Sequence, residues 1–74
     1  MAMEENKKWG FKKNEPNIIF KVHLLGGNGL IEYYLPEDKK RHSAWLDETI
    51  FIDEKDVPLE RKQEYDDLYN ELGY

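Results

Sequence analysis

The chain lacks most of the side chains that carry enzyme chemistry. Its 74 residues contain no cysteine, one serine, one threonine and two histidines. Without cysteine there is no disulfide and no thiolate ligand for zinc, and the histidines, His23 and His42, are too far apart for a zinc-ligand motif. Carboxylates are plentiful, but so short a chain has little room for a water-excluding cleft. We therefore expect a non-enzymatic protein without metal or cofactor.

Long apolar runs are also absent. No stretch approaches the roughly 20 apolar residues that span a bilayer, and residues 1–13 contain no apolar core of a secretory signal. These features predict a cytoplasmic protein that does not enter a membrane. The length allows one domain, residues 1–74. A domain of this size buries only about 60% of its unfolded surface, so we expect modest stability.

What the chain does contain is charge and aromatic rings. Charged residues make up 36% of the sequence, and the net charge is −5. Residues 1–52 contain eight acids and eight bases, whereas residues 53–74 contain eight acids and three bases, so the whole excess lies in the last segment. Two tryptophans, five tyrosines and three phenylalanines provide large side chains for a small core. Charge placed this unevenly bears on binding partners rather than on the fold.

The clearest local pattern is a β-hairpin over about residues 17–35. Two runs with alternating apolar side chains flank the segment Gly26-Gly27-Asn28-Gly29, and an Asn-Gly between such runs is a strong hairpin signal. Two registers are open, with either Leu25 or Gly27 opposite Leu30. Both registers place the same apolar side chains on one face of the hairpin. That face contains Ile18, Phe20, Val22, Leu24, Ile31, Tyr33 and Leu35.

The flanking segments predict further strands. Residues 1–6 are expected to be disordered. Trp9 and Phe11 alternate within residues 7–13, which predicts a short edge strand. Residues 37–43 are expected to form a charged connection. Residues 49–53 begin with a β-branched and aromatic run, Thr49 to Ile52, and predict a third main strand.

The last segment predicts an amphipathic helix over about residues 58–72. Pro58 suits a first helical turn, Tyr65, Leu68, Tyr69 and Leu72 share one helical face, and Gly73 is placed as a C-terminal cap. The expected fold is therefore α+β: a small antiparallel sheet, formed by the hairpin plus one or two further strands, packed against this helix. We expect the apolar hairpin face to contact the helix, with Trp45, Ile50 and Ile52 completing the core.

The helix also carries an acidic stripe. Glu60, Glu64, Asp67 and Glu71 fall within roughly 60° of the helical circumference. Their i,i+4 pairs repel, which costs the helix a few tenths of a kcal/mol each. A helix that retains such repulsion can do so for a partner. With Asp53, Glu54 and Asp56 of the preceding turn, the stripe predicts a surface that binds a larger protein with a basic surface.

Two readings compete with partner binding by the stripe. It can be an ordinary solvated face, or it can be neutralised within the chain by Lys7, Lys12 or Lys39. A nucleic-acid-binding module is the alternative function, because basic and aromatic residues alternate in two clusters, and lysines can track phosphates while exposed rings stack on bases. The residues concerned are Lys7, Lys8, Trp9, Lys12, Lys39, Lys40 and Arg41.

A third hypothesis is a self-associating structural subunit, that is, a homodimer. It would pair through an uncovered hairpin edge or through the second hairpin face, formed by Ile19, Leu25, Leu30 and Tyr34. The size, the acidity and the lack of a catalytic set are similar to those of small proteins encoded by bacteriophages and mobile elements. Many of those bind and inhibit one host macromolecule, which implies a regulator or inhibitor. The similarity includes no motif and gives no residue a role.

Overall fold

The computed structural model describes residues 8–74, and the expected disorder of residues 1–6 lies outside that range. Five strands and one helix follow one another along the chain: β1 (Trp9–Lys12), β2 (Phe20–Leu25), β3 (Leu30–Tyr34), β4 (Arg41–Trp45), β5 (Thr49–Ile52) and α1 (Leu59–Leu72). Two short 3₁₀ turns, η2 (Leu46–Glu48) and η3 (Glu54–Asp56), flank β5. The fold is a five-stranded antiparallel sheet packed with a C-terminal helix, which confirms the predicted α+β class, although the sequence predicted only three or four strands. No helix of residues 8–74 has the length and apolar character needed to span a bilayer.

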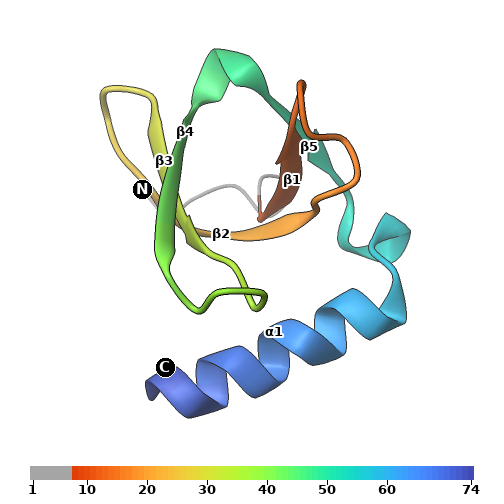
Figure 1. Ribbon diagram of the computed structural model, residues 1–74. Helices are drawn as coiled ribbons and strands as arrows, with labels where there is room; N and C mark the ends of the chain where they lie inside the picture. Colours follow the sequence, from red (N-terminus) through yellow and green to blue (C-terminus); the bar gives the residue numbers. More distant parts are fainter. Residues whose placement is uncertain (1–7) are drawn as a thin grey trace.

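The strand order is β4-β3-β2-β1-β5. Figure 1 shows the sheet curling, so that β3 and β4 lie on one side, β1 and β5 on the other, and β2 crosses between them above α1. β5 returns to pair with β1, with Gly10 opposite Phe51 and Phe11 opposite Ile50. The prediction that residues 7–13 form an edge strand is therefore wrong for β1, which is paired on both sides. Its second partner lies about 40 residues away along the chain, a distance at which local patterns carry no information.

The predicted hairpin is confirmed as β2 and β3, with a register that changes along its length. Next to the turn it is neither of the two expected, whereas Val22 pairs with Tyr33, as it would if Leu25 lay opposite Leu30. The Gly26 amide donates to the Leu30 carbonyl at 2.8 Å, so Gly27, Asn28 and Gly29 form a three-residue loop. Gly29 adopts a positive φ of 86°, a conformation that glycine reaches without steric cost. The Asn28 side chain accepts a hydrogen bond from the Leu30 amide.

A β-bulge lies in β2 between Val22 and Leu24. Val22 pairs with Tyr33, but beyond the bulge Leu25 pairs with Ile31 and Leu24 with Glu32. One extra residue reverses the alternation of the strand. Leu24, expected in the core, is therefore 54% exposed, and Leu25 packs against the core instead.

The segment expected to be a charged connection contains a strand. A turn at residues 36–39 leads into β4, which pairs with β3 along its whole length. The sequence Arg-His-Ser-Ala-Trp has no apolar alternation, so the long-range pairing with β3 forms this strand rather than local propensity. Ala44 faces the core, and Trp45, expected in the core, is 50% exposed.

The predicted third main strand is confirmed as β5, but only one of its two expected core residues packs against the core. Thr49 is buried, and its hydroxyl donates to the Trp45 carbonyl at 2.9 Å. Ile50, expected in the core, is 43% exposed, while Ile52 is partly buried. Neighbouring residues of a strand point to opposite faces, so the inward position of Thr49 puts Ile50 on the outside.

The predicted helix is confirmed as α1. Pro58 lies at its N-cap, and Gly73 ends it in the left-handed conformation, with φ 87° and its amide donating to the Tyr69 carbonyl. Tyr65 and Leu68 are buried. These features follow the sequence closely, because proline at the first turn and glycine after the last one act locally.

The helix contacts a different face of β2 from the one expected. Phe20 stacks on Tyr33 at 3.8 Å between ring centroids, on the inner face of the curled sheet. The contacts of the helix go to the opposite face: Trp9 lies edge-on to Tyr65 at 5.4 Å, and the Lys21 ammonium lies 4.9 Å from the Tyr69 ring. β2 is thus covered on both faces. The curl of the sheet buries the apolar hairpin face that we expected the helix to bury.

Candidate functional site

The four carboxylates of the predicted acidic stripe are all exposed on α1. They differ in what surrounds them, and this difference decides which of them is available to a partner. The residues concerned are Glu60, Glu64, Asp67 and Glu71.

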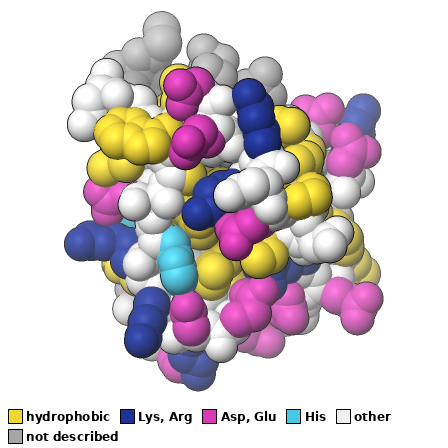
Figure 2. All heavy atoms as spheres, turned by 45° about the horizontal axis from the view of Figure 1, so that its top comes forward, with side chains coloured by type: hydrophobic (Ala, Val, Ile, Leu, Met, Phe, Trp, Pro, Cys, Tyr) yellow, Lys and Arg dark blue, Asp and Glu magenta, His cyan; other side chains and the backbone are white. Residues whose placement is uncertain are grey.

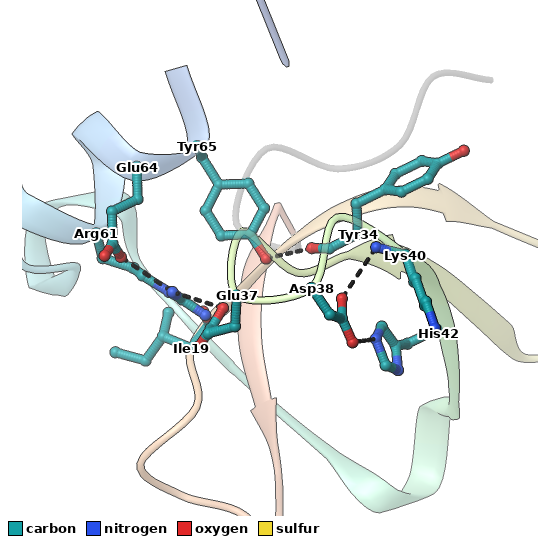
Figure 3. Close-up of polar contacts among 9 residues, drawn as sticks. All are labelled: Ile19, Tyr34, Glu37, Asp38, Lys40, His42, Arg61, Glu64 and Tyr65. Atoms are coloured by element: carbon teal, nitrogen blue, oxygen red, sulfur yellow. Dashed lines mark hydrogen bonds and ion pairs between the residues drawn. The ribbon is translucent and has the colours of Figure 1, made fainter. Parts of the chain in front are cut away.

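Glu64 belongs to a network centred on Arg61 (Figure 3). Arg61 Nη1 lies 3.0 Å from Glu64 and 3.1 Å from Glu37, and Nε donates to the Ile19 carbonyl at 2.6 Å. The Arg61 side chain is only 12% exposed. Burial lowers the pKa of Arg61, but the hydrogen bonds that it donates to Glu64 and Glu37 outweigh this effect, and the net shift of the pKa is upward. Arg61 therefore remains charged and ties the helix to the segment before β2 and to the turn after β3.

The far end of the stripe is also compensated. Lys39, in the turn before β4, lies 2.7 Å from Glu71. The Asp67 carboxylate accepts a hydrogen bond from the side-chain amide of Gln63 at 3.2 Å. Of the three lysines considered as internal partners, Lys39 takes that role, Lys12 pairs with Glu15 at 3.6 Å instead, and Lys7 lies outside the described residues.

The largest group of carboxylates without an ion pair lies at the N-terminal end of α1, and Asp47, Glu48, Asp66 and Asp67 are the others within residues 8–74. Asp53 follows β5, Glu54 and Asp56 lie in η3, and Glu60 lies in the first helical turn. All are exposed, and among residues 8–74 no ion pair to them is found. Leu59 lies among them and is 79% exposed. We call residues 53–60 the acidic junction. With Lys55 as its single base it carries a net charge of −3.

The basic-aromatic clusters are less available than the sequence suggested. Trp9 is 4% exposed and packs on Tyr65, so it cannot stack on a base. Arg41 pairs with Glu32 at 3.3 Å, and Lys12 and Lys39 have the carboxylate partners described above. Lys8 and Lys40 have no ion pair among the described residues, and Lys7 is not described.

A second polar group, missed in the sequence, orders the turn before β4 (Figure 3). Asp38 accepts from the Lys40 amide at 2.9 Å and contacts His42 Nε2 at 2.8 Å. The hydrogen bond from the Lys40 amide, together with that from His42, lowers the pKa of the Asp38 carboxyl. An aspartate side chain that accepts from the backbone amide two residues later is a common turn pattern. The sequence therefore contained a signal for the contact between Asp38 and Lys40.

The surfaces that we considered for self-association are partly covered in the structure. β4 covers the β3 edge of the hairpin, and β1 covers the β2 edge from Phe20 to Val22. On the second hairpin face Ile19, Leu25 and Tyr34 pack against the core, and the open edges of the sheet belong to β4 and β5. Among residues 8–74 no group of three or more histidine, aspartate or glutamate side chains is arranged to hold a metal ion.

Comparison with protein families, with curated proteins and with solved structures found no match to the chain. Its function therefore has to be argued from its own surface. That surface carries a compensated polar network along the middle and end of α1 and an uncompensated acidic junction at its start.

Proposed function

We propose that this chain is a non-enzymatic binding protein that regulates or inhibits a larger protein by docking the acidic junction on a basic surface. The observation that carries the proposal is that the acidic junction gathers four exposed carboxylates without an ion pair, more than any other segment of residues 8–74. Glu64 and Glu71 are held by Arg61 and Lys39, whereas Asp53, Glu54, Asp56 and Glu60 have no ion-pair partner within residues 8–74. The binding surface is thus narrower than the stripe predicted from the sequence.

The charge of the acidic junction can guide the encounter with a basic partner. A patch of one sign steers an oppositely charged partner and raises the association rate. Leu59, at the centre of the acidic junction, offers apolar area that the partner would bury. The carboxylates have a local effect as well: acids near a helix N-terminus stabilise the helix through its dipole, by about 0.3–1 kcal/mol each. Binding and stability must therefore be measured on the same variants.

The test uses two variants with equal net charge. One reverses the acidic junction at three positions, Glu54→Lys, Asp56→Lys and Glu60→Lys. The matched control reverses three exposed acids elsewhere on the chain, Glu15→Lys, Asp66→Lys and Asp67→Lys. Wild type and both variants are immobilised and exposed to lysate of the source cell, and the retained proteins are identified by mass spectrometry. Circular dichroism and thermal melts establish that each variant is folded.

The proposal predicts a protein with a basic surface that is retained by wild type and by the control but lost by the junction variant. Its binding should weaken with salt, because the contact is between exposed charges. Retention by the folded junction variant would overturn the proposal. So would equal loss from both variants, because binding would then follow net charge and not this surface.

The nucleic-acid alternative has less support from the structure, since Trp9 is buried and three of the basic residues face carboxylates. The same preparations can be assayed by gel shift at low salt. A shift that weakens when Lys39, Lys40 and Arg41 are replaced by alanine would favour it over the acidic junction.

A further inference from the structure

β4 forms an open edge of the sheet. The Lys40 carbonyl accepts from Leu35 and the Leu46 amide donates to Gly29, so the even-numbered positions of this strand bond toward β3. Backbone groups of an antiparallel strand alternate between its two neighbours. The amides and carbonyls of Arg41, Ser43 and Trp45 therefore point away from β3, and of these groups the Trp45 carbonyl already accepts from the Thr49 hydroxyl. β4 is the last strand in the order, so within the described chain no strand pairs with this side.

Natural sheets usually protect such an edge with a proline, an inward-pointing charge or a bulge. β4 has no proline and no bulge in the sequence Arg41-His42-Ser43-Ala44-Trp45, and its protection is limited to the charge of Arg41 at its start and to its short length. Ser43 at its centre is small and exposed, and the Trp45 side chain is 50% exposed. An open edge that displays an exposed tryptophan is a site for strand addition.

The charges along this edge are complementary to those of the same edge on a second, antiparallel copy. Lys40 and Arg41 lie at its start, and Asp47 and Glu48 lie just past its end in η2. Arg41 and Trp45 lie two residues on either side of Ser43, on the same face of the strand. When a strand of this kind pairs with a copy of itself in antiparallel orientation, its basic end meets the acidic end of the copy.

We infer that the open edge of β4 pairs with β4 of a second copy of this chain, in an antiparallel register centred on Ser43, to form a symmetric dimer. Ser43 faces Ser43 of the second copy as a hydrogen-bonded pair, and Arg41 faces Trp45 of the second copy on either side of it. About four backbone hydrogen bonds join the strands, because the Trp45 carbonyl of each copy already accepts from Thr49. Each Arg41 guanidinium lies within reach of a tryptophan ring for a cation–π contact.

The inference concerns the edge of the sheet opposite β5 and does not depend on the acidic junction. A two-fold contact uses the same patch on both copies, and this patch is short, so the dimer belongs among small and weakly bound interfaces. It differs from the self-association predicted from the sequence, which placed the contact on a hairpin edge or on the second hairpin face.

The first test measures the oligomeric state of the full chain by sedimentation velocity at concentrations up to roughly 1 mM. We expect a monomer–dimer equilibrium that Ser43→Pro weakens by at least about tenfold, because proline lacks the central amide hydrogen yet is tolerated on an edge strand. Ser43→Ala, which keeps the amide, should dimerise like wild type. A wild-type monomer at the highest concentration, or a dimer unaffected by Ser43→Pro, would overturn the inference.

The second test fixes the register and does not require the proline variant to fold. Cα atoms of a hydrogen-bonded antiparallel pair are about 5.5 Å apart, within the range that a disulfide bridges. The chain has no cysteine, so oxidised Ser43→Cys can form only one bond, between two copies. We expect rapid covalent dimerisation of Ser43→Cys and slow dimerisation of the control Asp66→Cys, on exposed α1. Equal rates for the two would also refute the register.

Discussion

Replacing Arg61 by methionine should destabilise the fold more than any other single change to an exposed or half-buried charge on α1. Methionine keeps an unbranched stem and a similar helix propensity, so the comparison isolates the guanidinium. That group donates to the Ile19 carbonyl and lies over the Tyr65 ring, with its carbon 5.3 Å from the ring centroid.

The size of the effect follows from the exposure of each partner. Loss of the hydrogen bond to Ile19 leaves a part-buried carbonyl unsatisfied, at a cost of about 1–3 kcal/mol. The carboxylates of Glu37 and Glu64 are 54% and 55% exposed, so these ion pairs together contribute only about 0–1 kcal/mol. Arg61 Nη2 is buried without a hydrogen-bond partner among the described residues. The cost of burying it offsets part of the stabilisation that Arg61 provides. We expect a net loss of about 2 kcal/mol.

A loss of that size is large for this chain. A domain of its length has a free energy of unfolding of about 4–11 kcal/mol, and 1 kcal/mol shifts Tm by about 4–8 °C. Thermal unfolding followed by circular dichroism should therefore show Tm lowered by about 8–16 °C. Lys62→Met is the control, because Lys62 is the next residue of the same helix and forms no ion pair within residues 8–74. Similar Tm values for the two variants would refute the role given to Arg61.

Two further predictions test other parts of the fold. Burial raises the pKa of Tyr65, whose hydroxyl donates to the Tyr34 carbonyl. The contribution of Tyr65 to stability is complete below the unfolded tyrosine pKa of about 10 and is lost as pH rises above it. We therefore expect Tm to fall between about pH 9 and 11, and to fall less steeply for Tyr65→Phe. Equal slopes for the two proteins would contradict this. Gly10→Ala should destabilise the β1–β5 pair by about 1–3 kcal/mol, because a Cβ there would lie 2.7 Å from the Ile50 carbonyl oxygen, whereas Gly27→Ala meets nothing within 4 Å. Urea unfolding of both variants measures the difference, and equal midpoints would argue against the close approach.

Much of the local structure could be predicted from the sequence. The Asn28-Gly29 turn, the β-branched run of β5 and the Pro58-to-Gly73 helix depend on propensities that act within a few residues. The concentration of acidic residues in the last segment is likewise a property of the sequence. These features identified the fold class and the region that carries the excess charge.

The tertiary structure decided how these parts meet. The bulge in β2 turns Leu24 outward, and the pairing with β3 makes a strand of a segment with no strand pattern. Folding also brings Arg61 to Glu37 and to the Ile19 carbonyl, and Lys39 to Glu71, while the acids of the acidic junction have no ion pair within residues 8–74. Contacts between residues so far apart along the chain depend on the closing of long loops around a common core. Residue type and spacing therefore identified which side chains are charged, and only the folded chain determined which of those charges are neutralised within it.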